Sequence, residues 1–119
     1  AGALAPGALV TDVGSVKASV VELLPGLLPA GVEFVGSHPM AGSHLRGPQH
    51  ASAELFVGAS VVVTPRTGQD PEPVERIEAF WRALGARVTR RSPAAHDEEV
   101  AWVSHLPHLV AFAFADALR

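Results

Sequence analysis

Two polar clusters follow apolar runs in this chain, and each carries a side chain that could take part in chemistry. The first run, residues 8–13, leads directly into Gly14 and Ser15, and the second, residues 32–37, leads directly into His38. A neutral imidazole can accept a proton from a substrate hydroxyl near neutral pH, which is why histidine is a frequent general base. The pattern therefore favours acid–base chemistry around His38, with Ser15 nearby.

Both apolar runs have the composition of buried strands. The position of the polar side chains that follow them can therefore be predicted from the fold. In open α/β sheets, ligands bind in the crevice beyond the carboxyl ends of the strands. Ser15 and His38 come directly after the predicted strands at 8–13 and 32–37. We therefore expect both side chains at the edge of the sheet where such folds bind their ligands.

Helical patterns separate these strands. One predicted helix runs from Ser15 to about Leu24, and a second begins at Pro71 after an Asp70 N-cap and ends at Gly85. Two further strands are predicted, at 59–64 and, with arginines that suit a sheet edge, at 87–90. The alternation of strands and helices implies a mostly parallel sheet with right-handed crossovers.

The last predicted element is a long apolar helix. Ser92 is suited to be its N-cap and Pro93 its first residue, and the helical pattern continues to Arg119, about 40 Å at the usual rise. Pro107 should kink this helix, because proline removes a backbone donor and crowds the preceding turn. Polar residues spaced by seven and four lie on one helix face and need partners, of which a bound ligand is one possibility. These residues are Asp97, Ser104 and His108.

The order of elements predicts an α/β fold, the C-terminal half of a Rossmann-like sheet followed by a long apolar helix that leads into a helical domain. We expect residues 1–91 to form a partial nucleotide-binding domain and the helix at 92–119 to lead into another layer or domain. The Gly-x-Gly-x-x-Gly loop that opens dinucleotide-binding domains is absent from the sequence. The chain is therefore expected to be a piece of a longer protein, incomplete as an enzyme, whose strand at 8–13 exposes a pairing edge.

Composition narrows the function classes. The chain has 119 residues, of which 48% are hydrophobic and 18% charged, and its net charge is −3. Lysines and arginines are scattered, so we expect no nucleic-acid partner. There is no cysteine, which excludes disulfides and thiolate chemistry and is compatible with the cytoplasm. No apolar stretch is expected to span a membrane, because the longest, residues 109–115, is too short.

Four short motifs occur in order along nearly the whole chain. They are Thr11-Asp12-Val13-Gly14-Ser15-Val16-Lys17, His38-Pro39-Met40-Ala41-Gly42-Ser43, His96-Asp97 and Ser104-His105-Leu106-Pro107-His108. Together they resemble the prephenate dehydrogenase family, which includes arogenate dehydrogenases. The resemblance implies oxidation of a cyclohexadienol in tyrosine biosynthesis, with hydride passing to NAD or NADP and the ring carboxylate leaving as CO2.

The resemblance also implies roles for particular residues. His38 matches the family's catalytic histidine, the proton acceptor at the ring hydroxyl, and Ser15 matches the serine that hydrogen-bonds the same hydroxyl. Positions that contact substrate carboxylates are matched by Ser43, Ser104 and His108. The nicotinamide end of the cofactor is expected near Thr11, Asp12 and Ser37. The resemblance also implies that residues 92–119 begin a helical substrate and dimerisation domain. The implied partners are prephenate or arogenate and a second copy of the protein, as a homodimer.

Each of these residues also has a purely structural interpretation. His38 could cap a turn before Pro39, Ser15 could be a helix N-cap, and Asp12 could be a turn or cap residue. Ser104 and His108 could bond each other or a backbone carbonyl near the proline. Asp97 could orient either of them, or favour the start of its own helix electrostatically.

Other function classes stay open at this point. The six histidines raise the question of a metal site, but no zinc-binding spacing is present and none is expected. Ser15 and His38 could suggest a hydrolase, but the Gly-x-Ser-x-Gly elbow is missing. The main alternative is an inactive structural or dimerising fragment, or a binding module of Rossmann descent.

Overall fold

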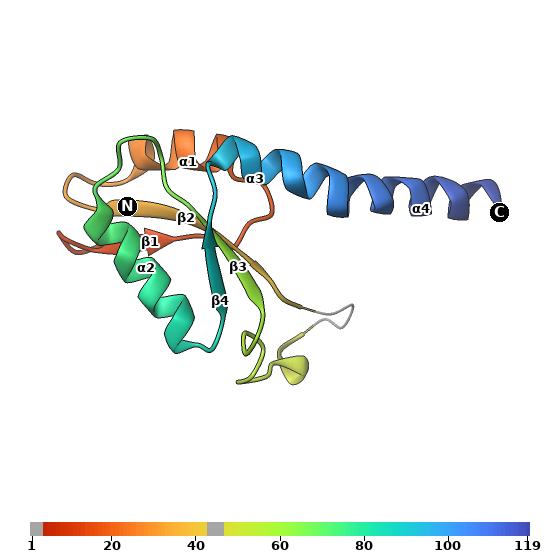
Figure 1. Ribbon diagram of the computed structural model, residues 1–119, viewed down its shortest axis with the longest axis horizontal. Coiled ribbons are helices and arrows are strands. Elements are labelled where there is room, and N and C mark those ends of the chain that lie inside the picture. The colour runs from red at the N-terminus through yellow and green to blue at the C-terminus, as the bar shows by residue number, and fades with distance from the viewer. Residues whose placement is uncertain (1–3, 43–46) are drawn as a thin grey trace.

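A mixed four-stranded sheet forms the centre of the molecule in a computed structural model that describes residues 4–42 and 47–119 (Figure 1). The strands are β1 (Leu9–Thr11), β2 (Glu33–Met40), β3 (Ser60–Thr64) and β4 (Arg87–Arg90), in the order β1-β2-β3-β4. β1 pairs in parallel with β2, and β3 with β4, whereas β2 and β3 are antiparallel. The predicted α/β fold with a mostly parallel sheet is confirmed, and β4 lies at the predicted edge.

Two strand boundaries differ from the prediction. β1 is shorter than residues 8–13, because the chain turns away after Thr11. β2 is longer than residues 32–37 and continues to Met40, because its second half pairs with β3, with His38 opposite Val62. His38 is therefore held within a strand, and the structural alternative, in which it caps a turn before Pro39, is wrong.

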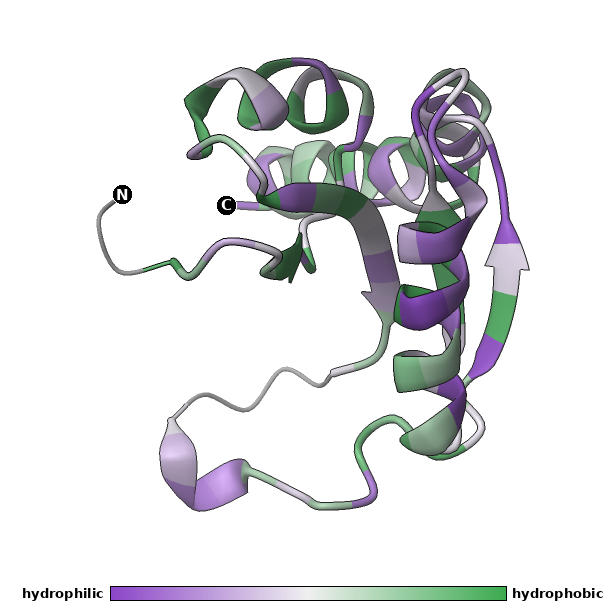
Figure 2. Cartoon of the chain, turned by 90° about the vertical axis from the view of Figure 1, so that its left-hand side faces the viewer, coloured by the Kyte–Doolittle hydropathy of each residue, from purple (hydrophilic) through white to green (hydrophobic). Residues whose placement is uncertain are grey.

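One face of the sheet packs on helix α2 (Pro71–Ala83). Asp70 is its N-cap, with its carboxylate accepting a hydrogen bond from the Glu72 N–H, as the sequence predicted. The chain leaves the helix through Gly85, whose φ of +84° suits glycine. The colouring of Figure 2 shows hydrophilic and hydrophobic residues alternating along this helix beside the sheet. The main apolar core is formed here by Val35, Val61, Val63, Val74, Ile77, Trp81 and Ala86.

The opposite face of the sheet is covered by α1 (Ala18–Leu23) and α3 (Pro93–Val100), which also contact each other (Figure 1). Because side chains alternate along a strand, Gly36 and His38 of β2 face these helices while Val35 and Ser37 face α2. A Cβ at Gly36 would lie 2.7 Å from Cγ2 of Val21 in α1. The absence of a side chain there lets the helix approach the strand closely.

The first helix is shorter than predicted. It begins at Ala18 with Lys17 in the N-cap position, so the interpretation of Ser15 as the helix N-cap is wrong. The helix then tightens into a 3₁₀ turn, η1 (Leu24–Leu27), where Pro25 interrupts the α-helical bonding. A second 3₁₀ turn, η2 (Pro48–His50), lies in the segment between β2 and β3.

Beyond the sheet the chain forms a long helical rod that projects from the body of the molecule (Figure 1). Ser92 caps α3 as predicted, accepting a hydrogen bond from the Ala95 N–H. The rod continues through a π-helical turn, η3 (Ala101–His105), into α4 (Leu106–Ala117). The disturbance predicted at Pro107 therefore takes the form of a widened turn, which relieves the crowding that proline causes with the carbonyl four residues earlier.

Most apolar side chains of the rod are exposed. They are Trp102, Val103, Leu106, Leu109, Val110, Phe112, Phe114 and Leu118. The continuous segment Pro93–Ala117 is long and apolar enough to cross a membrane by length and composition, contrary to the sequence prediction that no stretch qualifies. This is a weak indication of a membrane, because a helix that packs on another protein surface passes the same test.

Candidate functional site

The candidate site lies where β2 extends beyond the carboxyl end of β1. Thr11, the last residue of β1, pairs with Val35, and β2 continues to Met40. Asp12 therefore turns across β2 beside Ser37, and His38 follows on the other face of the same strand. This is the edge at which the sequence predicted the chemistry.

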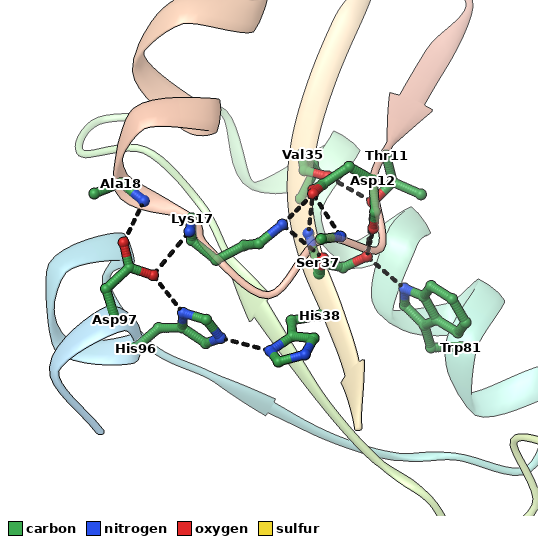
Figure 3. Close-up of polar contacts among 11 residues, drawn as sticks. Thr11, Asp12, Lys17, Ala18, Val35, Ser37, His38, Trp81, His96 and Asp97 are labelled. Atoms are coloured by element: carbon green, nitrogen blue, oxygen red, sulfur yellow. Dashed lines mark hydrogen bonds and ion pairs between the residues drawn. The ribbon is translucent and has the colours of Figure 1, made fainter. Parts of the chain in front are cut away.

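A buried ion pair fixes the loop after β1. Lys17 is completely buried, and its ammonium group pairs with the Asp12 carboxylate and donates a hydrogen bond to the Ser37 carbonyl at 3.0 Å (Figure 3). The Asp12 carboxylate also accepts hydrogen bonds from the N–H groups of Gly14 at 2.9 Å and Ser37 at 3.1 Å. Because a buried charge is costly unless it is paired, this set of contacts holds the loop against β2. Lys17 received no role from the sequence, and here it locks the loop in place.

Hydroxyl groups complete the internal network on the α2 face. Thr11 Oγ1 donates to the Val35 carbonyl at 2.6 Å and lies 2.9 Å from Ser37 Oγ. Ser37 Oγ donates to the Asp12 carbonyl at 2.6 Å and accepts from the Trp81 indole N–H at 3.1 Å (Figure 3). The structure thus brings Thr11, Asp12 and Ser37 together and engages their polar atoms in contacts within the protein. Their role at a cofactor stays a prediction.

His38 opens into a cavity of about 330 Å³. The cavity is lined by His38, Pro39, Met40, Ala41, Val100, Val103 and Ser104. Partial burial, together with the neighbouring His96 and Lys17, lowers the pKa of His38 below its ordinary value, and the Asp12 carboxylate only partly opposes this. The imidazole is therefore neutral at neutral pH and able to accept a proton.

The residue that contacts His38 from the other side was given no role from the sequence. His96 of α3 is 1% exposed, and its Nε2 lies 2.9 Å from Nδ1 of His38 (Figure 3). Its own Nδ1 lies 2.8 Å from Oδ1 of Asp97. The His96-Asp97 pair stood out as a motif, but nothing in its spacing relates it to a strand 58 positions away.

Asp97 has a role that the helix pattern did not indicate. Its two carboxylate oxygens accept hydrogen bonds from the backbone N–H groups of Lys17 at 2.8 Å and Ala18 at 2.9 Å (Figure 3). Burial opposes ionisation of Asp97, but the hydrogen bonds from Ala18, His96 and Lys17 outweigh it and lower its pKa. Asp97 therefore supplies the N-terminal cap of α1, and does not join Ser104 and His108 around a ligand as the shared helix face suggested.

The remaining predicted site residues are spread over the edge of this cavity and beyond it. Ser104 is half-buried and lines the cavity with His38. His108 is exposed, and its Nδ1 donates to the Ser104 backbone carbonyl at 2.7 Å, which is the structural alternative the sequence allowed. Ser15 is exposed in the loop between β1 and α1. Ser43 lies outside the described residues. Across residues 4–42 and 47–119, no three histidine, cysteine or acidic side chains gather as a metal site would require.

Comparisons with known proteins agree along the whole chain. Residues 1–90 match the model of the prephenate dehydrogenase nucleotide-binding domain, and residues 92–119 match that of the prephenate dehydrogenase dimerization domain. A prephenate dehydrogenase of Bacillus subtilis is 41% identical over 87% of this chain and 28% of the relative's length. A cyclohexadienyl dehydrogenase of Zymomonas mobilis is 38% identical over 92% of this chain and 37% of the relative.

A solved structure is also similar. The prephenate dehydrogenase of Aquifex aeolicus, crystallised with hydroxyphenyl propionate and NAD+, superimposes with a TM-score of 0.89 and 39% identity. The match covers 97% of this chain and 40% of that one. The chain thus spans well under half the length of the relatives it matches.

Proposed function

The chain belongs to the prephenate dehydrogenase family, and from this premise we propose that the active protein oxidatively decarboxylates prephenate or arogenate in tyrosine biosynthesis. The hydride leaves the ring carbon that carries the hydroxyl, and the C–C bond to the ring carboxylate breaks to release CO2. The electron pair of that bond makes the ring aromatic. The hydroxyl proton is taken up as the hydride leaves and is returned to the phenol oxygen of the product.

His38 is the proton acceptor in this proposal, and its geometry is the observation that carries it. The imidazole faces a cavity and its pKa is lowered, and His38 lies in the part of β2 that is paired with β3, opposite Val62. A rigidly held neutral base next to a ligand-sized space is what proton removal from a bound hydroxyl requires. Ser15, in the loop that ends at α1, is proposed to hydrogen-bond the same hydroxyl.

The substrate carboxylates need several donors. We assign this role to Ser104, which lines the cavity, and to Ser43 and His108. His108 Nδ1 donates to the backbone carbonyl of Ser104, so the two residues lie close together on one face of the rod. The same rod also contributes the apolar side chains of Val100 and Val103 to the cavity lining, which suits the ring of a cyclohexadienol.

The described residues fit one end of a dinucleotide. Val13 and Val16 expose apolar side chains on the loop after β1, next to the anchored Asp12, and such a surface can pack against a nicotinamide ring. The chain contains no Gly-x-Gly-x-x-Gly loop to hold the phosphates. We therefore assign the nicotinamide end to this loop, which the contacts of Thr11, Asp12 and Ser37 hold against β2. NAD or NADP, when bound, supplies the hydride acceptor.

We further propose that residues 1–91 form part of the nucleotide-binding domain and that residues 92–119 begin a dimerisation domain. The exposed apolar face of the rod and the dimerization-domain match support a homodimer. The absence of cysteine is compatible with the cytoplasm, where we place the protein. Light scattering on the purified full-length protein tests the homodimer, and a monomer at high concentration would contradict it.

The activity is tested with the full-length protein, prephenate or arogenate, and NAD+ or NADP+, in all four combinations. Formation of the reduced nicotinamide, with release of CO2 in equal amount, is the expected result for at least one combination. Comparison among the four assigns the substrate and the cofactor. No turnover with any of them would contradict the proposed function and favour a binding module of the same descent.

A further inference from the structure

We propose that His96 is a positioning residue that holds neutral His38 with its proton on Nδ1, leaving Nε2 as the atom that accepts the substrate proton. The atom assignment follows from the hydrogen bonds of this chain. The identity of the proton donor, a substrate hydroxyl, rests on the function proposed above. Histidine in water prefers the opposite tautomer, with the proton on Nε2, so a base that uses Nε2 benefits from a partner that imposes the choice.

The argument begins at Asp97, whose hydrogen-bond partners have fixed roles. Backbone N–H groups can only donate, and those of Lys17 and Ala18 point to Oδ1 and Oδ2 respectively. Each carboxylate oxygen therefore accepts from a donor, and two such hydrogen bonds stabilise the ionised form of Asp97. The lowered pKa of Asp97 agrees with this. His96 Nδ1, 2.8 Å from Oδ1, must then carry a hydrogen and donate it.

The proton on Nδ1 of His96 decides the next bond. A neutral imidazole has one donor and one acceptor nitrogen, so Nε2 of His96 is the acceptor. Its neighbour at 2.9 Å is Nδ1 of His38, and two acceptors cannot face each other at that distance. His38 therefore donates from Nδ1 along the contact that Figure 3 draws between the two rings, and its lone pair is on Nε2.

Burial makes this arrangement stable. His96 is 1% exposed and bonded at both ring nitrogens, so it cannot rotate away without leaving buried polar atoms unpaired. Asp97 is tied to the start of α1, so the orientation of both rings depends on two helices that contact each other. A similar use of a carboxylate to orient a histidine and set its tautomer is known from serine proteases.

His38 can act as the base in only one protonation state of the His38–His96 pair, and the charged groups around the pair are few among the described residues. Lys17 and Asp12 face His38 from the loop after β1, His96 from α3 and His105 from the π-helical turn. Lys17 and Asp12 neutralise each other in their ion pair. If one proton is added to the two rings, either His38 becomes an imidazolium, or His96 donates from Nε2 and His38 carries hydrogen on Nε2. In both outcomes Nε2 of His38 carries a hydrogen, so His38 can act as the base only while the two rings hold no additional proton.

The direct test is the ¹⁵N spectrum of the full-length protein labelled at histidine, recorded above the titration of His38. The His38 signals are assigned by their loss in His38→Asn. We expect Nδ1 at the chemical shift of a protonated nitrogen and Nε2 at that of an unprotonated one. In His96→Leu the two shifts should exchange places. In His96→Gln they should stay, because the glutamine amide can accept from His38 while donating to Asp97.

Kinetics give the functional counterpart. His96→Leu should lower kcat by roughly 10- to 100-fold, the usual loss when a group that orients a histidine is removed. KM for the substrate should change little, because His96 lies behind His38 and has no contact with the cavity. His96→Gln should recover much of kcat. The matched control is His50→Gln, an exposed histidine in η2, which should behave like the wild type.

The outcomes separate this inference from the proposed function. Wild-type His38 with its proton on Nε2 would overturn the inference even if the enzyme turns over prephenate, and this measurement needs no variant of His96. Turnover unaffected by His96→Leu would also contradict it. Absence of turnover with the tautomer as predicted would refute the function and leave the positioning role of His96 supported.

Discussion

Consecutive side chains of β2 point to opposite faces of the sheet, and the side chains on the two faces have different roles. On the α2 face, Val35 and Ser37 are fully buried, and Ser37 is bonded to Asp12 and Trp81 within the protein. On the other face, His38 is only partly buried and opens into a cavity. One strand therefore carries structural contacts on one side and the candidate chemistry on the other.

This difference has a simple physical origin. A strand sends consecutive side chains to opposite faces, so a rigid core on one side fixes the position of groups on the other. The partner helices complete the contrast. α2 brings Val74, Ile77 and Trp81 to the sheet, whereas α3 brings the polar pair His96 and Asp97. Substitutions on the two faces should accordingly be separable into losses of stability and losses of activity.

The largest effect is expected from His38→Asn in the full-length enzyme. Loss of a general base lowers kcat by about 10²- to 10⁴-fold, and asparagine keeps a polar side chain of similar size. The apparent KM should change little, because the base acts mainly in the transition state. Steady-state kinetics with prephenate measure this. Near-normal turnover would remove His38 from the role of proton acceptor.

Trp81→Ala should have the next largest effect, on stability. Trp81 is 3% exposed in the apolar core and donates its indole N–H to Ser37 Oγ. Removing such a side chain costs about 3–5 kcal/mol in the free energy of unfolding. Denaturant titration measures the loss, and kcat of the folded fraction should stay close to the wild type. A large loss of kcat without loss of stability would break the distinction between the two faces.

Gly36→Ala tests the second face with a change that adds atoms. A Cβ at this position would lie 2.5 Å from Thr64 Oγ1 and 2.7 Å from Val21 Cγ2, so α1 or β3 must shift. Overpacking of this kind costs about 1–3 kcal/mol. Because Asp97 ties α1 to His96, kcat should fall as well, in contrast to Trp81→Ala. Thermal unfolding and kinetics on the same preparation check both effects, and unchanged values of both would contradict the close packing.

The smallest expected effect is a displacement of the pH profile. Burial and the neighbouring His96 and Lys17 lower the pKa of His38 from the ordinary 6.5. His38 must be neutral to accept a proton, so kcat/KM, which reports the pKa values of the free enzyme, should be high above this pKa and fall as the pH decreases through it. The midpoint of the acid limb should lie below 6.5. A midpoint above that value would mean that the Asp12 carboxylate outweighs burial and the neighbouring His96 and Lys17, which is the opposite of the expected balance.

Local signals were enough to predict much of the sheet side of this molecule. Two helix starts were predicted from an N-cap residue followed by proline, and the structure confirms both, at Asp70-Pro71 and at Ser92-Pro93. The end of β3 at Thr64 was predicted from the proline that follows it. The edge position of β4 followed from its arginines. These features depend on neighbours in the chain, which is why a single sequence can show them.

The features that were not predicted from the sequence depend on residues that are far apart in the chain. The antiparallel pairing that extends β2 through His38 needs β3, and the cap of α1 comes from Asp97, 79 positions from the N–H of Ala18. The polar spacing of Asp97, Ser104 and His108 was correct as a pattern, but packing against α1 gave Asp97 another use. His96 has no periodic signal of its own, so only the fold places it against His38.

The measurement that tests the central claim most directly compares two adjacent residues, Ser37→Ala and His38→Asn, in unfolding and in steady-state turnover. Ser37→Ala leaves the buried Trp81 N–H without its acceptor, which should cost about 1–3 kcal/mol of stability and leave kcat and KM for the dinucleotide nearly unchanged. His38→Asn should instead lower kcat strongly and leave the stability nearly unchanged. A raised KM for the dinucleotide with intact stability in Ser37→Ala would instead place Ser37 at the cofactor, and the division of β2 into a structural and a catalytic face would be wrong.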